Sequence, residues 1–409
     1  MDLSLGAEYD AFREEVRGFL KENWPPRGPD ETLSETEQVG RFRAKAIDAG
    51  YLARSIPKKY GGSGQPLDLV KSAAIEDAFR SAGAPEDPAD LGYALLIPTL
   101  LECGEEWQKE KFIPPTVRGE IRWCQGYSEP GAGSDLASVQ TRGEVVGDEW
   151  VINGQKIWTS TAEVADYIFC LVRTEPEQAK HAGISYLLID MHQPGIEVRP
   201  LKQMTGLTGF NEVFFTDAKT PKDWIIGERG GGWKVSRSTL KHERSGLRDI
   251  GDATAMLEPL VSLVKNSTKD GRPAIEHPEV RQKLAELEGS MLASAYSLQY
   301  RASKVLKGEN PGRIALMAKL IRTDSYQEVV KLALDLVGDD ALLMGGAQSE
   351  AISMGFEPPD RPTESAEWVA GFMGSLGFVS AGGTSNVQRN LIAEHGLGLP
   401  RDLAAQRSK

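Results

Sequence analysis

Hydrophobic residues recur at helical spacing in the first part of the chain. The first run places its apolar residues at Tyr9, Phe12, Val16, Phe19 and Leu20, which share one face of a helix. Similar amphipathic patterns follow over 36–53, 68–83 and 88–113, and prolines and the pair Gly61-Gly62 separate them. The pattern predicts a helical domain over residues 1–121.

The period of the apolar residues changes near Trp123. Asn153-Gly154 stands between two runs rich in β-branched and aromatic residues, which is a strong signal for a β-hairpin. Further strand-like runs occur at 167–172, 184–189, 196–200, 212–215 and 224–226. These runs predict a compact antiparallel β-domain over residues 122–229.

From Gly230 the helical period returns. It predicts long helices over 233–264, 278–307, 313–337 and 384–395, packed as a four-helix bundle in a domain of residues 230–409. The polar segment 265–277 is predicted to be a loop. Segment 345–383 contains Phe356-Glu-Pro-Pro-Asp-Arg-Pro362 and cannot form one continuous helix. The expected fold class is α+β.

Composition narrows the class of protein. A chain of 409 residues suggests two or three domains. No apolar run approaches a membrane span, and the N-terminus lacks the features of a secretory signal. The net charge of −12 argues against a nucleic-acid partner, and the three cysteines and five histidines lack metal-site spacing. We therefore expect a cytoplasmic protein with reduced cysteines, no metal and no nucleic acid.

The segment Gln125-Gly-Tyr-Ser-Glu-Pro-Gly-Ala-Gly-Ser134, followed by Asp135, carries the strongest chemical signal. Its small residues let the backbone approach a flat or anionic ligand closely. The hydroxyls of Ser128 and Ser134 can donate and accept hydrogen bonds. Alone, the segment is equally compatible with a glycine-rich surface turn.

Two further motifs decide between these interpretations. Asn153-Gly-Gln-Lys-Ile-Trp-Thr-Ser160 follows the first motif, and Gly383-Thr-Ser-Asn-Val-Gln-Arg389 lies near the C-terminus. In this order the three motifs resemble the acyl-CoA dehydrogenase family of FAD enzymes, from about residue 8 to the C-terminus. The resemblance implies a helical, a β- and a helical-bundle domain. It also implies α,β-dehydrogenation of an acyl-CoA thioester, with a base taking the α-proton while the flavin accepts a hydride.

The resemblance suggests one catalytic base. Family members carry the carboxylate either in a Tyr-Glu-Gly-Thr motif near the C-terminus or before an arginine on the first helix of the C-terminal domain. Gly382 occupies the first position and cannot act as a base, whereas Glu243-Arg244 matches the second. Glu243 is therefore the predicted base, and the alternative is an ordinary solvated Glu-Arg pair.

The resemblance also implies the ligand contacts. The predicted FAD contacts are Gln125, Tyr127, Ser128, Gly133, Ser134, Trp158, Thr159, Ser160, Thr384 and Asn386. Trp158 is expected against the flavin ring, with a core tryptophan of the β-domain as the alternative. Ser160 is expected near N5 of the flavin. The predicted substrate contacts are Ser134, Lys241 and Arg244.

Two segments depart from the family pattern. Ser267-Thr-Lys-Asp-Gly271 stands where relatives carry Arg-Lys-Thr-Phe-Gly, whose arginine and phenylalanine reach the FAD of a neighbouring subunit. Val337-Gly-Asp-Asp-Ala341 replaces a Gln-Ile-Leu-Gly-Gly segment, and its two aspartates would repel a pyrophosphate. These losses, with the runs 123–138 and 180–190, resemble the steroid and bile-acid side-chain members, which form α2β2 heterotetramers.

Several alternatives remain open at this level. The chain is expected to form a homo-oligomer or an α2β2 heterotetramer with a related chain, and to pass electrons to an electron-transfer flavoprotein. The acyl group is expected to be branched, long or steroid-like. The other functions considered are a flavin monooxygenase or oxidase on the same fold and a catalytically silent partner subunit. The insertion at 351–366 either shapes the active-site mouth or forms a surface excursion or subunit contact.

Overall fold

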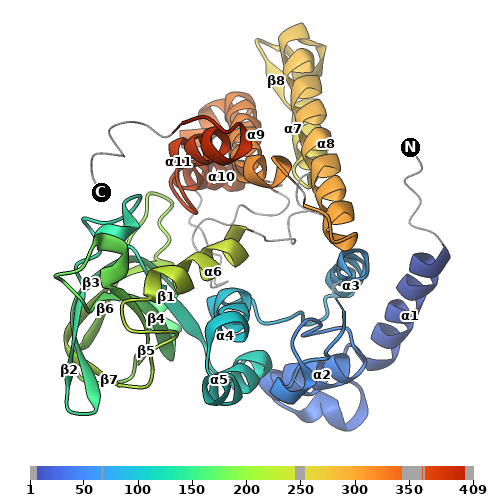
Figure 1. The fold of residues 1–409 in the computed structure, drawn as a ribbon. Coiled ribbons are helices and arrows are strands. Elements are labelled where there is room, and N and C mark those ends of the chain that lie inside the picture. Colours follow the sequence, from blue (N-terminus) through green and yellow to red (C-terminus); the bar gives the residue numbers. More distant parts are fainter. Residues whose placement is uncertain are drawn as a thin grey trace. The chain divides into compact units, whose positions relative to one another are not determined.

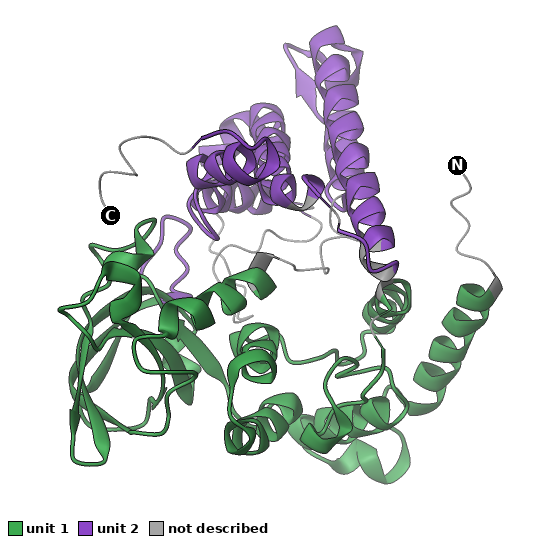
Figure 2. Ribbon diagram, in the orientation of Figure 1, with its two compact units in different colours: residues 1–199, 211–243 green, residues 200–210, 244–409 purple. Residues whose placement is uncertain are grey.

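The computed structural model describes residues 7–66, 68–244, 254–310, 312–342, 362 and 364–400 (Figure 1). The chain divides into two compact units (Figure 2). The first unit comprises residues 1–199 and 211–243, and the second comprises 200–210 and 244–409. Each unit has its own core of buried apolar residues.

The N-terminal part is helical, as the periodicity predicted. Its helices are α1 (Ala7–Asn23), α2 (Glu35–Asp48), α3 (Leu69–Ser81), α4 (Ile97–Cys103) and α5 (Glu106–Arg118). Helix α2 starts at a capping box, in which Ser34 and Glu37 each satisfy a backbone N–H of the other. The side chain of Asp68 caps the start of α3 by accepting hydrogen bonds from the backbone N–H groups of Val70 and Lys71. Local capping chemistry thus sets where these helices begin.

A curled sheet follows the N-terminal helices. Its strands are β1 (Trp123–Gly126), β2 (Arg142–Val146), β3 (Glu149–Ser160), β4 (Tyr167–Arg173), β5 (Ile184–Asp190), β6 (Ile196–Leu201) and β7 (Phe210–Pro221). The order is β1-β4-β2-β3-β7-β6, and β5 pairs with β4. The pairs β2–β3 and β4–β5 are antiparallel, as expected. The pairing of β4 with β1 is parallel, which the pattern did not predict.

The predicted Asn-Gly hairpin is wrong. Strand β3 runs through Asn153 and Gly154 without a turn, and the hairpin turns instead at Gly147-Asp148, between Val146 and its partner Glu149. Gly154 serves a different purpose. A Cβ at this position would lie 2.6 Å from the Cα of Thr141, so only glycine permits the close approach of the chain.

The C-terminal part is helical again. Its helices are α6 (Gly232–Arg244), α7 (Leu257–Asn266), α8 (Pro278–Leu306), α9 (Ile314–Val337), α10 (Ser365–Phe378) and α11 (Ser385–Leu391). The predicted loop at 265–277 contains a small hairpin of β8 (Thr268–Lys269) and β9 (Arg272–Pro273). Most of the predicted insertion at 351–366 lies outside the described residues.

Apolar side chains from several of these helices form the core of the second unit. They include Leu260 of α7, Leu287 and Met291 of α8, Val330 of α9 and Trp368 of α10. The burial of these residues supplies the main driving force for packing the bundle. No helix in the described part of the chain is long and apolar enough to cross a membrane.

Candidate active site

The glycine-rich motif forms a tight turn directly after β1. Backbone hydrogen bonds of 3.0 Å run in both directions between Glu129 and Ala132, so Pro130 and Gly131 form the tip. Gly131 and Gly133 are exposed, and a Cβ on either would meet no described atom within 4 Å. The loop therefore presents bare backbone to the open space above it.

A buried ion pair holds this loop, and the sequence reasoning missed it. The Lys156 ammonium on β3 lies 2.8 Å from a carboxylate oxygen of Glu129, and the two side chains are 0% and 7% exposed. Lys156 also donates to the carbonyl of Tyr127 at 3.2 Å. Both charged residues stand inside the two motifs, but nothing in the sequence indicated that they pair. The pair joins the first motif to the second.

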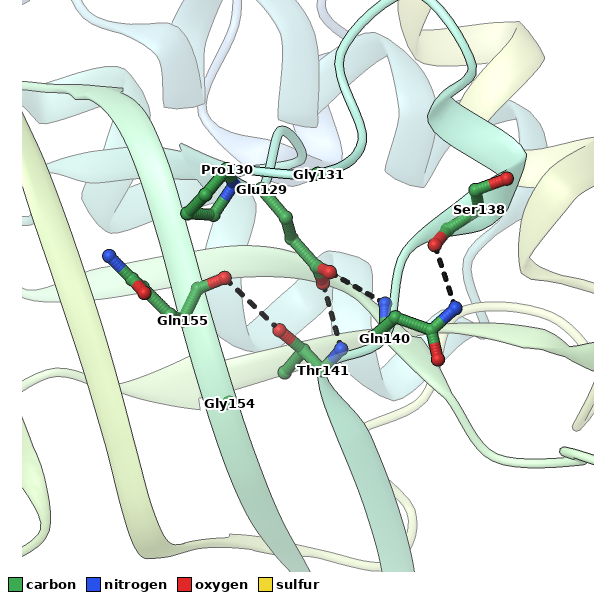
Figure 3. A pocket seen from close by; sticks show the side chains of 8 residues that line it. All are labelled: Glu129, Pro130, Gly131, Ser138, Gln140, Thr141, Gly154 and Gln155. Carbon is green, nitrogen blue, oxygen red and sulfur yellow. Dashed lines mark hydrogen bonds between the residues drawn. The ribbon is translucent and has the colours of Figure 1, made fainter.

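The Glu129 carboxylate has further hydrogen-bond donors besides Lys156. It accepts hydrogen bonds from the backbone N–H groups of Gln140 at 2.6 Å and Thr141 at 2.8 Å (Figure 3). Burial raises the pKa of this carboxyl, but the charge and hydrogen bond of Lys156 and the backbone donors outweigh burial and lower the pKa overall. Glu129 is therefore ionised at neutral pH.

An open hollow of about 460 Å³ borders the same loop. Its lining residues are Glu129, Pro130, Gly131, Ser138, Gln140, Thr141, Gly154 and Gln155 (Figure 3). Among the described residues, none of the predicted FAD contacts lines this hollow. The hollow is therefore a separate feature from the predicted flavin contacts.

Trp158 is not a core residue. Its side chain is 57% exposed near the end of β3, and its backbone is left-handed, with φ of +60°. A bulky residue in that region is strained and exposed to water, a combination found mainly at functional sites. The neighbouring Thr159 is buried, and Ser160 is partly buried. The core interpretation of Trp158 is therefore wrong.

The end of β3 is supported from β7. The buried Asn211 donates from Nδ2 to the carbonyl of Thr159 at 3.2 Å, and it also donates to the carboxylate of Glu163. A second left-handed residue, Thr161, follows with φ of +55°. Asn211 thus fixes the backbone on which Trp158 and Ser160 stand.

Three further predicted FAD contacts of the first motif differ in their surroundings and in their free hydrogen-bonding groups. Gln125 is partly buried, and its Nε2 is buried without a hydrogen-bond partner among the described residues. Tyr127 is 6% exposed, and its ring packs edge-on against Phe169 and Tyr186. Ser128 is bonded through its carbonyl to the N–H of Ile157 at 2.9 Å. The ring of Tyr127 therefore belongs to the core, whereas the amide of Gln125 has unused hydrogen-bonding capacity.

Helix α6 carries the predicted base. Glu243 and Arg244 lie in its last turn, and their side chains are outside the described residues. Lys241, predicted to bind substrate, lies 3.1 Å from the carboxylate of Glu102 on α4. The structure thus gives Lys241 an intramolecular partner that the sequence did not indicate.

The third motif begins α11 in the second unit. Thr384 is the N-cap, and its hydroxyl accepts from the N–H of Val387 at 3.2 Å. Asn386 accepts from Arg389 at 3.5 Å. Gly382, at the alternative base position, is left-handed with φ of +60°. Both Thr384 and Asn386 therefore have local capping or helix contacts.

Known family models match all three parts of this architecture. Models of the acyl-CoA dehydrogenase N-terminal, middle and C-terminal domains match residues 6–120, 124–218 and 230–397. Three such domains in this order, with the motif loop in the middle one, define an α+β oxidoreductase. The chain belongs to the acyl-CoA dehydrogenase family, whose members depend on FAD.

Several relatives match over nearly the full chain. Acyl-CoA dehydrogenase IpdE1 of Mycobacterium tuberculosis is 35% identical, covering 97% of this chain and 99% of the relative. The ChsE4-ChsE5 complex from Mycobacterium tuberculosis contains a chain of 30% identity and TM-score 0.75, covering 98% of this chain and all of that one. The Tcur3481-Tcur3483 steroid ACAD gives 29% and 0.75 with the same coverage. These matches confirm the predicted resemblance to the steroid-type members.

Proposed function

We propose that this chain catalyses the FAD-dependent α,β-dehydrogenation of an acyl-CoA thioester to the trans-2-enoyl-CoA, with Glu243 as the base. The observation that carries the proposal is the exposed, strained Trp158 on a strand that Lys156 ties to an open glycine loop. Such a loop and an exposed aromatic ring suit a flat cofactor. Family membership gives that cofactor its chemical identity.

The residues of the first unit fit FAD. Gly133 leaves open space, Nε2 of Gln125 lacks a described partner, and Trp158 offers an exposed ring. The proposed contacts are Gln125, Tyr127 through its backbone, Ser128, Gly133, Ser134, Trp158, Thr159 and Ser160. The family resemblance adds Thr384 and Asn386 to the proposed FAD contacts. When bound, FAD would accept the hydride that leaves the β-carbon.

The chain itself would handle the proton and the thioester. The Glu243 carboxylate would take the α-proton, which a base does best when its pKa is raised toward the working pH by an apolar, closed site. Ser134 and Arg244 would hold the acyl-CoA, and Lys241 would do so from its place beside Glu102. The proposed domain limits are 1–121, 122–229 and 230–409.

The test is the variant Glu243→Gln. It keeps the shape of the side chain but removes the proton acceptor, so the purified variant should retain its flavin spectrum and lose bleaching by acyl-CoA under anaerobic conditions. Glu258→Gln on α7 is the matched control, because this exposed glutamate lies outside the proposed site. Wild-type bleaching by the Glu243 variant would refute the proposed base.

We further propose that the chain works in an assembly with a related chain, on a bulky steroid-like acyl group. Two observations support the assembly. The two segments by which relatives reach a neighbour's FAD are replaced, one by the β8–β9 hairpin and one by a turn of 3-10 helix at Gly338–Leu342. The steroid ACAD relatives named above are complexes of two chains. An electron-transfer flavoprotein is the proposed electron acceptor.

A further inference from the structure

Three side chains of α6 converge on one carboxylate of α4. Glu102 lies at the end of α4, and its carboxylate accepts a hydrogen bond from the hydroxyl of Ser238. Lys241 Nζ donates to Oε1 of the same carboxylate at 3.1 Å, and His242 Nε2 lies 3.1 Å from that oxygen. The hydrogen bond from Ser238 is the main cause that holds the pKa of Glu102 below its usual range, with Lys241 and His242 contributing further. The acceptor is therefore a charged carboxylate.

These three residues have the spacing of one helix face. Residues three and four apart on a helix are neighbours, so Ser238, Lys241 and His242 form a stripe along the last turns of α6. One carboxylate that contacts all of them spans positions 238 to 242, about one turn near the C-terminal end of the helix.

A second contact holds the same turn of α6 from another side. The buried hydroxyl of Thr239 lies 2.9 Å from that of Thr99 on α4 and 3.3 Å from that of Tyr186 on β5. Val235, one turn earlier, is buried in the core that the two helices share. Helix α6 is thus buried on its Thr239 side and held by charge on its Ser238 side.

The end of a helix is where this second kind of support matters. The last carbonyl groups of a helix lack partners within it, so the terminal turn frays unless other contacts hold it. Glu243 directly follows His242 in that turn of α6. Contacts that order positions 238, 241 and 242 therefore also order the backbone at position 243.

We infer that Glu102 is a positioning residue, which holds the last turn of α6 so that Glu243 is presented to the α-carbon of the acyl-CoA. This inference rests on the proposed function of Glu243. Glu102 and Lys241 are 40% and 68% exposed, and exposed ion pairs contribute little to stability. The contact is consequently better suited to setting geometry than to stabilising the fold.

The test compares Glu102→Ala and Glu102→Gln with Glu106→Gln. The alanine variant removes all three contacts, whereas the glutamine variant keeps an acceptor for Ser238 and loses the charge. Glu106 is a matched control, since it pairs with Lys59 and Tyr60 and not with α6. The measurements are the rate of flavin reduction by acyl-CoA in a stopped-flow instrument, the KM, the FAD content and the melting temperature.

Misplacement of a reacting group by about 1 Å can cost about 100-fold in rate. We expect Glu102→Ala to slow flavin reduction at saturating acyl-CoA by about 10- to 100-fold, with FAD content and melting temperature close to those of the wild type. Glu102→Gln should recover part of the rate, and Glu106→Gln should match the wild type. A purely structural role would instead lower melting temperature and FAD content and leave the rate per bound flavin unchanged, and that result overturns the inference.

Two further outcomes separate this inference from the function on which it rests. If Glu243→Gln is inactive while Glu102→Ala reduces flavin at the wild-type rate, the positioning role alone is overturned. If Glu243→Gln is fully active, the proposed function fails first. Should Glu102→Ala fold poorly, Ser238→Ala removes one contact only, and a wild-type rate in that variant and in Glu102→Gln overturns the inference.

Discussion

The Glu129 carboxylate and the Lys156 ammonium lie 2.8 Å apart in a place that solvent barely reaches. Glu129 stands in the turn after β1, and Lys156 stands on β3 two residues before Trp158. The proposed flavin contacts of the first unit come from these same two segments. One buried ion pair therefore sets the relative position of the open glycine loop and the exposed tryptophan.

Removing one member of this pair should destabilise the protein strongly. Glu129→Gln leaves the Lys156 charge buried without its partner, and such a change costs about 3–5 kcal/mol. Denaturant unfolding of the apoprotein measures the loss. Glu197→Gln, which breaks the exposed pair with Arg199, should change the free energy of unfolding little. Equal effects of the two variants would contradict the importance of burial.

The same pair gives a pH dependence of known sign. Because the folded protein lowers the pKa of Glu129, its contribution to stability is complete above the unfolded pKa of about 4.3 and is lost as the pH falls through the lower folded value. The gap in unfolding free energy between wild type and Glu129→Gln should stay constant from neutral pH down to about pH 5 and shrink below about pH 4.3. Unfolding curves recorded across that range test this, and a gap that widens in acid would be the wrong sign.

Trp158 should matter for the cofactor and little for the fold. Trp158→Gly relieves a left-handed backbone, worth about 1–2 kcal/mol, and this offsets the added freedom of the unfolded chain, about 0.4–1 kcal/mol. The apoprotein should therefore keep its stability, while FAD affinity should fall about tenfold or more through loss of the ring. FAD titration measures the affinity for the cofactor, and denaturant unfolding of the apoprotein measures its stability. Asp217→Gly, at another left-handed residue on β7, should leave FAD affinity intact.

Gly383 should not tolerate a side chain. Its φ is +93°, and a Cβ there would lie 2.8 Å from Nε2 of Gln388, a buried residue that donates to the carbonyl of Gly382. Gly383→Ala should cost about 1–3 kcal/mol in the free energy of unfolding. Gly289→Ala, in the exposed middle of α8 with no described atom within 4 Å of its Cβ, should instead stabilise by about 1 kcal/mol. Changes of the same sign would refute this distinction.

The proposed assembly predicts how much flavin the chain retains alone. Expressed by itself, it should purify with less than one FAD per chain, because the segments that reach a neighbour's cofactor are replaced in this sequence. Co-expression with a related chain should raise the flavin absorbance and give a larger complex in light scattering. A full complement of FAD in the chain alone would show that it completes its own site as a homo-oligomer.

Local patterns predicted the secondary structure well where one face of an element is apolar. Most helices overlap the predicted runs because side-chain burial and capping act over a few residues, but α10 (Ser365–Phe378) lies in a segment for which no helix was predicted. The Asn153-Gly154 turn failed for a physical reason. Glycine serves equally in a turn and in a strand that passes close to another chain segment, and only the neighbour Thr141 distinguishes the two.

In the candidate site, too, the sequence predicted local features and missed contacts between distant residues. Sequence motifs indicated the glycine loop and Trp158, but not that Trp158 is exposed and left-handed. They contained Glu129 and Lys156 without revealing that the two meet, since 27 residues separate them along the chain. Pairing across such a distance depends on strand order and register, which local propensity does not encode.

The amino-acid sequence by itself determined the family, the order of helical and β segments and the positions of the three motifs, because residue type and short-range periodicity carry that information. Tertiary structure alone decided which charges meet. Glu102 comes to Ser238, Lys241 and His242 across 136 to 140 residues, and Glu129 comes to Lys156 across the sheet. Such contacts follow from the packing of whole helices and strands, because the burial of their apolar faces determines where each polar side chain lies.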